Sequence, residues 1–459
     1  MIPSTETGFW RIDMPRLILI YASMGRAPGR KFVRSWQQEP LAMGVLAALT
    51  PAEWEVVFFD DRVEAIDYSL QADLVGISIE TYSAKRGYQI AAKFRKNGVP
   101  VIFGGYHATL CPDEAIEHAD SVCVGEAESL WQGILDDALH SRLAKRYKGV
   151  TVNPLKDIPV DRSLFAGKRY LKLSLIETGR GCPFKCNFCS INAFYKSTYR
   201  RRSIADIIKE VSAVENKYIF FVDDNFTGDI ASARELFREV KQYRKRWMTQ
   251  LSVAGLTDRD FVQEMAASGC IAVLIGFESL DGLNLNSMNK SVNRLDEFSR
   301  ILSNLREVGI FVYGTFVFGY PHDTADLYGR TVAFAQEEKM FIAAFNHLVP
   351  FPGTALYREL EAAGKMRYDK WWLSDEYYFG EVPFKPETMT AKEVEERCLL
   401  ARKQFYSIPS IMRRALDGKC NCGSARNILT YVQINHMLRK EVTEKRGVRL
   451  GFREGTNAT

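Results

Sequence analysis

At 459 residues the chain is long enough for two or three domains. Its hydrophobic content of 46% and charged content of 25% are ordinary for a globular protein, and a formal net charge of +5 favours neither nucleic acid nor a membrane surface as a partner. No apolar run reaches the length of about 18 residues that predicts a membrane span, and the N-terminus lacks the basic and apolar regions of a secretory signal.

Short strands alternate with helices in the first part of the chain. Most of these strands are apolar runs without polar alternation, which is typical of a parallel sheet covered on both faces. We therefore predict a doubly wound, Rossmann-like α/β domain over residues 1–140, with ligands beyond the carboxyl ends of its strands. The expected strands are 17–21, 54–60, 74–79, 101–103 and 121–124, and the expected helices are 40–49 and 82–97.

The distinctive residues of this domain follow the predicted strands. Glycines at such positions let the backbone approach a large flat or phosphorylated ligand closely. The candidate ligand-binding residues are Asp60, Ser78, Glu80, Thr81, Gly104, Gly105, Tyr106, His107, Ala108, Thr109, Gly125 and Glu126.

Residues 141–168 lose this periodicity and contain Pro154 and Pro159, so we predict a linker. Six strand–helix cycles over 169–360 then predict a partial TIM-like barrel of six parallel strands, with its chemistry at their carboxyl ends. The expected strands are 172–178, 218–222, 250–254, 272–277, 312–318 and 344–349, and the expected helices are 204–215, 232–244, 258–268, 295–308 and 324–338.

The last region, 361–459, is predicted to be mainly helical, with a frayed tail after Gly447. The expected helices are 391–405 and 425–439, and an aromatic stretch at 371–379 either lines a substrate pocket or packs on the barrel. This region also holds three cysteines whose spacing does not specify an auxiliary cluster. They are Cys398, Cys420 and Cys422.

The most specific motif of the chain is ETGRGCPFKCNFCS. Three and then two residues separate Cys182, Cys186 and Cys189, so their thiolates can converge on one soft metal centre. Three thiolates would leave one iron of a [4Fe–4S] cluster open to an outside ligand, and Phe184 and Phe188 would shield the cluster from water. The alternative is a structural zinc site, but zinc needs four protein ligands and no fourth Cys or His lies close by in sequence.

This C-x3-C-x2-C pattern, with an aromatic residue before the last cysteine, resembles the signature of radical S-adenosylmethionine (radical SAM) enzymes. The resemblance implies that the amino and carboxylate groups of SAM chelate the open iron, and that one electron from the cluster cleaves SAM to methionine and a 5′-deoxyadenosyl radical. It also implies an electron donor such as flavodoxin or ferredoxin. With this motif, nine cysteines suggest a reducing cytoplasm and not a disulfide framework.

Residues that match the chemical groups of SAM stand at consecutive strand ends of the predicted barrel. The family's amino-group motif, often G-G-E, is replaced here by V-D-D-N, so the atom that binds the ammonium stays open. Each acid alone is more often a helix cap or a solvated strand end. The candidate SAM contacts are Asp223, Asp224 and Asn225 for the ammonium, Gln250 and Ser252 for the ribose or carboxylate, Glu278 for the ribose hydroxyls, Phe188, Phe318 and Gly319 for the adenine, and Phe184 beside the cluster.

Three arginines, Arg200, Arg201 and Arg202, follow the cluster loop. They predict either contacts to an anionic cofactor or substrate group, or a solvated basic turn.

The runs GGYHAT and VGEAE resemble the cobalamin-binding domain that precedes the radical SAM core in one large subfamily. The D-x-H-x-x-G motif of cobalamin domains that hold cobalt through histidine is absent, because Gly105 stands two positions before His107. The resemblance therefore implies cobalamin bound without a histidine below the cobalt, and an empty, vestigial domain is the alternative. For His107 itself, a hydrogen bond to backbone is the simpler interpretation than cobalt ligation.

Together these resemblances predict a cobalamin-dependent radical SAM enzyme, whose commonest reaction in the subfamily is methylation of an unactivated carbon of a small-molecule biosynthetic intermediate. One alternative is ring formation, rearrangement or oxidation without methylation, and another is a non-catalytic corrinoid- or cluster-binding carrier or sensor. A methylthiotransferase would need three cluster cysteines in the first domain, which has only Cys111 and Cys123. No motif specifies the substrate.

Overall fold

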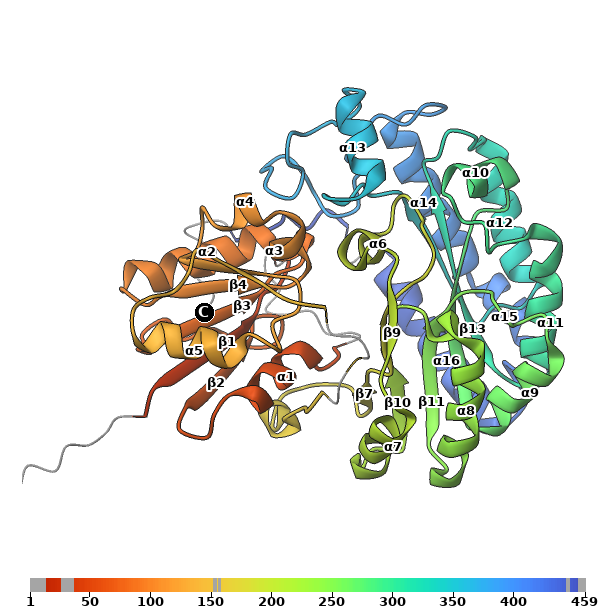
Figure 1. Ribbon diagram of the computed structural model, residues 1–459. Helices are drawn as coiled ribbons and strands as arrows, with labels where there is room; N and C mark the ends of the chain where they lie inside the picture. The colour runs from red at the N-terminus through yellow and green to blue at the C-terminus, as the bar shows by residue number, and fades with distance from the viewer. Residues whose placement is uncertain (1–13, 26–36, 152–154, 156–157, 443–445, 453–459) are drawn as a thin grey trace, which may run out of the picture.

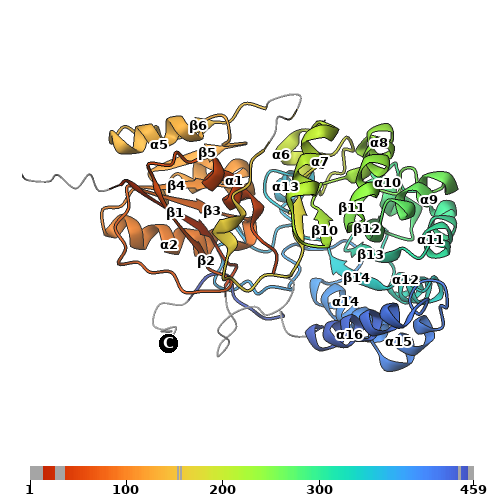
Figure 2. The ribbon, with the colours of Figure 1, turned by 90° about the horizontal axis from the view of Figure 1, so that it is seen from below.

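The computed structural model describes residues 14–25, 37–151, 155, 158–442 and 446–452. Two six-stranded parallel sheets form its framework, the first coloured red to orange and the second green to cyan in Figure 1. Helices surround both sheets, and further helices follow the second sheet near the C-terminus, as Figure 2 shows from below. The predicted fold class is therefore confirmed: a doubly wound domain, a partial six-stranded barrel and a helical C-terminal region.

The first sheet is covered on both faces, as its apolar strands predicted. Helix α2 packs on one face with Ile90 and Phe94, and α1 and α5 pack on the other with Met43 and Trp131. The strand order is β2-β1-β3-β4-β5-β6. The elements are β1 (Arg16–Tyr21), α1 (Leu41–Leu49), β2 (Glu55–Asp60), β3 (Leu74–Ser78), α2 (Ala84–Lys96), β4 (Val101–Gly104), α3 (Tyr106–Leu110), α4 (Pro112–Ala115), β5 (Ser121–Val124), α5 (Trp131–Leu139) and β6 (Arg146–Lys148).

Strand β6 lies within the stretch that the sequence predicted as a linker. It is the polar run RYK and pairs in parallel with β5. Because it is not an apolar run, the hydrophobic pattern of the sequence did not indicate a strand there. The domain boundary at residue 140 stays a prediction. Helices α3, α4 and α5 were also not expected, the first two because they are single short turns.

The second sheet has the strand order β14-β13-β12-β11-β10-β7, and all its pairs are parallel. The prediction of a strand at 250–254 is wrong in position, because β11 begins at Arg246 and its alternating sequence RWMTQL hid its start. The elements are β7 (Ser174–Ile176), α7 (Ile204–Ala213), β10 (Tyr218–Phe221), α8 (Ile230–Val240), β11 (Arg246–Leu251), α9 (Arg259–Ala267), β12 (Cys270–Glu278), α10 (Gly282–Ser287), α11 (Phe298–Glu307), β13 (Phe311–Phe318), α12 (Ala325–Glu337) and β14 (Ile342–His347).

An antiparallel hairpin, not predicted from the sequence, interrupts the first cycle of this sheet. Strand β8 (Gly179–Gly181) pairs with β9 (Tyr199–Arg201), and the cluster loop and α6 (Ser190–Tyr195) lie between them. Gly181 has a φ of 85°, and a Cβ there would stand 2.1 Å from the Thr198 carbonyl oxygen, so this turn requires glycine.

The four C-terminal helices are α13 (Ala355–Ala362), α14 (Ala391–Phe405), α15 (Ile408–Ala415) and α16 (Ala425–Glu441). Of these helices, α14 packs against β14, and α15 packs against α12 and α14. The buried Arg414 guanidinium joins them to the sheet, because it donates hydrogen bonds to the carbonyl oxygens of Met340 and Phe341 and to Asn435. No helix of the described residues has the length and hydrophobicity that crossing a bilayer requires.

Two expectations for this region are wrong. The aromatic stretch packs on the first domain and not on the barrel, since Trp371, Trp372 and Tyr377 belong to the core beside the first sheet. The tail is also not frayed up to residue 452, because Gly451 bridges to Gly25 and Phe452 donates its backbone N–H to Gln89. Residues 453–459 lie outside the described part of the chain.

One buried carboxylate, Glu114, ties these aromatic residues to the first domain. It accepts hydrogen bonds from Tyr88 at 2.8 Å and from Trp372 at 3.0 Å, and its Oε1 lies 3.0 Å from His107 Nε2. Burial raises the pKa of Glu114, but hydrogen bonds from His107, Trp372 and Tyr88 outweigh burial and lower it to about 2. The ionised carboxylate therefore stabilises the contact between the first domain and residues 371–379.

We expect Glu114→Ala to lower the free energy of unfolding by about 3 kcal/mol, because it leaves several buried donors without an acceptor. Urea denaturation at neutral pH measures this loss, with the exposed Glu117→Ala as the control within about 0.5 kcal/mol of wild type. Because the folded pKa is depressed, the difference should shrink as the pH falls from above about 4.3 toward 2. Equal stability of the two variants at neutral pH would contradict this account.

Candidate active site

The three motif cysteines lie on the loop between β8 and α6. Cys186 is buried, and Cys182 and Cys189 are partly buried. Burial raises the pKa of the Cys186 thiol to about 11, and the neighbouring Cys189 and Cys182 add to this effect. A positive metal centre would reverse it, because metal binding releases the thiol protons.

The geometry of this loop differs from that of a mononuclear site. Among the described residues, no three His, Cys, Asp or Glu side chains approach one another closely enough to hold a single metal ion. An iron–sulfur cube requires wider sulfur spacing than a zinc ion, because each cysteine binds a different iron. The three cysteines of the loop are the thiolates that such a cluster would use.

The acidic run after β10 holds the cluster loop in place. Asp223 accepts hydrogen bonds from the backbone and hydroxyl of Thr178, and Asp224 accepts one from the backbone of Gly181 at 2.7 Å. Asn225 places its amide nitrogen 3.6 Å from Cys182 Sγ. Both Asp223 oxygens are thus used within the protein, which argues against the predicted role of Asp223 as a SAM contact.

Asp224 and Asn225 lie closer to the predicted SAM position. Burial, together with Asp223, raises the pKa of Asp224 to about 6. Asn225 accepts a hydrogen bond from the backbone of Ser252 at 2.9 Å, so the ends of β10 and β11 are joined. Gln250 lies on β11, which ends one residue before Ser252. The Gln250 side chain is on the opposite face of the strand from the buried Leu251.

A lysine that was not predicted from the sequence lies beside the cluster loop. Lys290 lies 3.1 Å from Glu278, and both side chains are largely buried. Burial alone lowers the pKa of Lys290, but Glu278 and the nearby Cys186 and Cys189 raise it above its usual value. Glu278 has a φ of 66°, a strained backbone for this residue type that aims its carboxylate at the lysine.

No sequence motif marks Lys290, since it comes from a loop after α10 that only tertiary folding brings to the cysteines. Asn187 was missed for the same reason. Its amide donates to the Ser287 carbonyl and its oxygen accepts from Tyr320, so it fastens the cluster loop to the end of α10 and to the segment after β13.

The aromatic residues predicted to contact SAM or the cluster lie in different surroundings. Phe188 packs edge-on against Tyr320 at 6.4 Å between ring centroids, beside the cluster loop. Phe318 stacks on Tyr328 at 4.1 Å on the helix side of the sheet, so only its backbone and Gly319 face the strand ends. Phe184 is partly buried, and its backbone N–H is directed at the Cys182 sulfur.

The strand ends of the first sheet offer an accessible surface around β3 and β4. A Cβ added to Gly104 would meet no atom within 4 Å, and a Cβ added to Gly105 would stand 2.7 Å from the Ile79 carbonyl oxygen. Glu80 is exposed to solvent, yet the protein surrounding it raises its pKa to about 7 by desolvation. Ser78 lies beside these residues at the end of β3. The open space beside Gly104 therefore lets a ligand approach the backbone closely at this strand end.

Several other candidates from the first domain are occupied by protein contacts. Asp60 is fully buried and binds Arg62 at 2.7 Å and the Tyr170 hydroxyl at 2.8 Å. His107 is also fully buried, with Glu114 and the Thr81 hydroxyl beside its two ring nitrogens. Neither its predicted backbone hydrogen bond nor cobalt ligation fits this geometry. The buried Ala108 and the Thr109 hydroxyl, which accepts from the Gly125 backbone, support the turn after β4.

Glu126 of the VGEAE run binds the hairpin of the second domain and does not face an open surface. Its carboxylate contacts Arg180 at 3.1 Å and also pairs with Arg200. Arg180 additionally contacts Glu128 at 2.6 Å and Glu177 at 3.0 Å. The arginine run after the cluster loop is therefore not a solvated basic turn, since the side chains of Arg200 and Arg202 are only 2% exposed.

The two sets of strand ends meet at Tyr106. Its ring packs 4.7 Å from that of Phe194 on α6, and Tyr195, Asp224 and Glu80 all contribute to raising its pKa after burial. Thus Tyr106 of the first domain lies between the open strand ends of β3 and the acidic run beside the cluster loop.

A cavity of about 440 Å³ lies along β14, the edge strand of the second sheet. Tyr313 and Asn346 line it from the sheet, and Arg402 and Arg446 line it from the C-terminal region. Burial and the nearby Arg402 lower the pKa of His347 to about 3, so its imidazole is neutral. Glu395 and Glu441 also line this cavity, and Glu395 lies 3.7 Å from Arg446.

Family models match most of both sheets. The model of the radical SAM superfamily matches residues 176–335, and that of the B12 binding domain matches residues 37–135. The first match contains the cluster loop and the ends of β10 to β13, and the second contains the strand ends around Gly104.

Curated relatives extend over nearly the whole chain. The bacteriochlorophyllide d C-8(2)-methyltransferase of Chlorobaculum tepidum is 31% identical over 403 residues, which are 83% of this chain and 88% of the relative. The bacteriochlorophyllide d C-12(1)-methyltransferase of the same organism is 29% identical over 83% of this chain and 85% of its own length.

Solved structures share the fold. The radical SAM methyltransferase TsrM from Kitasatospora setae, with cobalamin and a [4Fe-4S] cluster bound, aligns with a TM-score of 0.65 and 18% identity over 85% of each chain. The cobalamin-dependent SAM radical enzyme OxsB, with aqua-cobalamin bound, aligns with a TM-score of 0.67 and 14% identity over 94% of this chain and 72% of its own.

We expect Cys186→Ala to lose nearly all of the about four irons per chain that anaerobic reconstitution should give to the wild type, because two thiolates do not retain the cube. Iron and sulfide analysis after desalting measures this. Cys270→Ala, which removes a buried thiol from β12, is the matched control and should keep its iron. Full iron content in Cys186→Ala would place the cluster elsewhere.

We expect Glu126→Ala to raise amide hydrogen exchange in the β8–β9 hairpin at least about tenfold, because it removes the carboxylate of the first domain that both Arg180 and Arg200 contact. The control is Glu307→Ala, which removes a surface ion pair with Arg259 and should change exchange little. An unchanged hairpin in Glu126→Ala would show that the domains are held together by other contacts.

Proposed function

We propose that this protein is a cobalamin-dependent radical SAM methyltransferase acting on an unactivated carbon of a small-molecule biosynthetic intermediate. The chain belongs to the radical SAM superfamily and also contains a B12 binding domain. The observation that carries this proposal is the meeting of the two sets of strand ends at Tyr106, between Glu80 and Asp224. Methyl transfer requires the cobalamin and SAM sites to share one reaction space, and this arrangement supports such a shared space.

The residues around the cluster loop suit SAM binding. When bound, the cluster supplies the electron that cleaves SAM, and cobalamin supplies the methyl group. Cys182, Cys186 and Cys189 hold the cluster, and Asp224 and Asn225 accept hydrogen bonds from the SAM ammonium. Lys290 offers its cation to the SAM carboxylate, while Glu278 binds the ribose hydroxyls or holds Lys290 in place. Gln250 and Ser252, with Phe188 and the Phe318–Gly319 backbone, complete the ribose and adenine contacts.

Cobalamin lies, in this proposal, over Ser78, Glu80, Gly104, Gly105 and Tyr106, with no histidine below the cobalt. Glu126 acts through Arg180 and Arg200 by fixing the first domain over the cluster loop. The substrate enters from the cavity beside β14, where Arg402 offers a cation to an anionic group. We further propose a cytoplasmic location, because reduced thiols are needed, and an electron donor such as flavodoxin or ferredoxin.

A cyclic tetrapyrrole is the first substrate class to test, since two relatives are named for bacteriochlorophyllide d. We expect the protein, reconstituted anaerobically with iron, sulfide and hydroxocobalamin, to hold about four irons and one cobalt per chain. With a reductant it should form 5′-deoxyadenosine and transfer a trideuterated methyl group from labelled SAM to the substrate, as detected by mass spectrometry.

The reconstituted Cys186→Ala variant is the control and should form neither product. A cyclised or oxidised product without the label would favour the ring-forming alternative. Such an outcome has a precedent among the relatives, because an anaerobic magnesium-protoporphyrin IX monomethyl ester cyclase from Rubrivivax gelatinosus is 24% identical over 76% of this chain. Absence of 5′-deoxyadenosine despite a full cluster would leave only the carrier or sensor role.

A further inference from the structure

Helices α15 and α16 expose an unusual number of large apolar side chains. Leu416 is 82% exposed and Met412 is 65% exposed. Residues 408, 412 and 416 recur at intervals of four, so they lie on one side of α15 and its end, while Ser410 and Arg414 face inward. The exposed apolar residues of the two helices, here called the α15–α16 surface, are Ile408, Met412, Leu416, Ile428, Leu429 and Val432.

The same surface is basic and has no exposed acid. Between Arg397 and Lys440 the sequence contains a single acidic residue, Asp417. Asp417 is buried and accepts hydrogen bonds from the backbone N–H groups of Lys419 and Asn421. None of the exposed basic side chains forms an ion pair within the described part of the chain. They are Lys403, Arg413, Lys419, Arg426, Arg439 and Lys440.

This surface lies far from the candidate active site. Arg426 stands over the ring of Tyr218, the first residue of β10, and Arg414 binds the carbonyls of Met340 and Phe341 just before β14. The helices therefore cover the amino ends of the strands, about 20 Å of strand away from the carboxyl ends. In Figure 2 both helices, in blue, lie on an outer side of the second domain. A cluster reductant has no reason to dock there.

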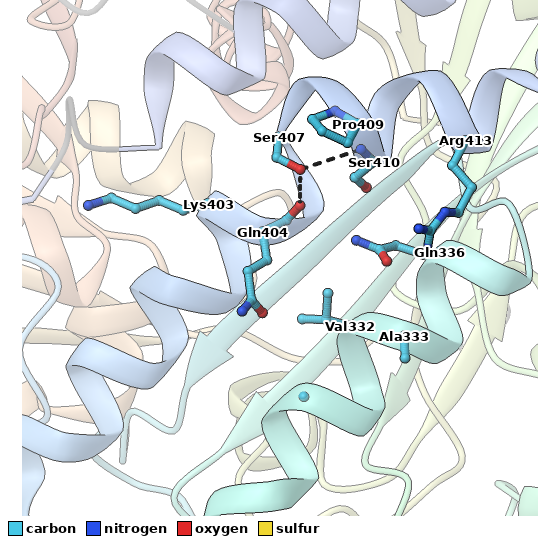
Figure 3. Close-up of a pocket in the computed structure, with 10 residues that line it drawn as sticks. Val332, Ala333, Gln336, Lys403, Gln404, Ser407, Pro409, Ser410 and Arg413 are labelled. Atoms are coloured by element: carbon cyan, nitrogen blue, oxygen red, sulfur yellow. Dashed lines mark hydrogen bonds between the residues drawn. The ribbon is translucent and has the colours of Figure 1, made fainter.

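A groove of about 550 Å³ adjoins the α15–α16 surface. It lies between α12 and the turn from α14 to α15, and Gln336, Ser407 and Arg413 are among its lining residues. Figure 3 shows the Lys403 side chain on one side of Gln404 and Arg413 on the other. This combination of cations and polar groups next to apolar side chains suits a phosphate head group with its acyl chain.

We propose that the α15–α16 surface docks the protein on an anionic lipid bilayer. The apolar side chains enter the boundary between head groups and acyl chains, and the six basic side chains contact lipid phosphates. Charge favours this occupant over a second copy of the chain, because a symmetric contact would oppose like charges with no exposed acid to pair with them. The active site then remains free at the opposite end of the barrel.

Vesicle flotation with the full-length protein tests this proposal. The protein should float with vesicles of phosphatidylcholine containing one third phosphatidylglycerol, and much less with phosphatidylcholine alone or at high salt. The double variants Met412→Glu/Leu416→Glu and Arg413→Glu/Lys419→Glu should each weaken binding at least about tenfold. Leu139→Glu, an equally drastic change at a 45% exposed position on α5, is the matched control and should bind as wild type does.

Circular dichroism would verify that each variant is folded, as expected for exposed positions. Failure of the wild type to float with anionic vesicles would overturn the proposal, and so would undiminished flotation of both double variants. A dimer in light scattering that Met412→Glu/Leu416→Glu converts to a monomer, without any vesicle binding, would assign the surface to a second copy instead. Each outcome is independent of whether the protein transfers methyl groups.

Discussion

The arrangement of the molecule depends on the charge network between the VGEAE run and the cluster hairpin. Arg180 and Arg200 are nearly inaccessible to solvent, and each needs a carboxylate because a buried guanidinium without a partner is costly. Glu126 reaches both arginines from the first domain, and Glu128 adds a second contact to Arg180. Since Gly181 and Cys182 directly follow Arg180, this network connects the orientation of the first domain to the position of the cluster loop.

The cluster loop is held from every side by groups that are not themselves cluster ligands. Asp224 binds the loop before Cys182, and Asn225 approaches the Cys182 sulfur. Asn187 fastens the loop between the second and third cysteines to the end of α10 and to the segment after β13. Lys290 places a positive charge beside the same thiols. Such preorganisation keeps the loop in one conformation without relying on the cluster alone.

The aromatic segment and the helices of the C-terminal region have different roles. Its aromatic residues and the segment that ends at Phe452 pack on the first domain through Trp372 and Phe452, which adds a second connection between the two domains. Its helices cover the amino ends of the barrel strands and carry the exposed basic and apolar side chains. The chain thus uses one end of the barrel for chemistry and leaves the other available for association, which in our proposal is with lipid.

The sequence by itself determined the two parallel sheets, because buried parallel strands are apolar runs that alternate with helices, and it determined the cluster cysteines, because all three lie within eight residues of one another. The sequence did not determine which residues at the strand ends are free of contacts within the protein. Asp60, His107 and Glu126 resembled ligands in sequence, yet their partners Arg62, Glu114 and Arg180 occupy them.

Only the tertiary structure decided the long-range features. Lys290 comes near Cys186 because two loops more than a hundred positions apart meet, and no local pattern encodes such a contact. The net charge of +5 gave no sign of the basic α15–α16 surface, because the sum over the chain cancels charges that folding separates in space. Burial of Asp417 and exposure of Leu416 are properties of packing, which hydrophobic periodicity over short helices does not define.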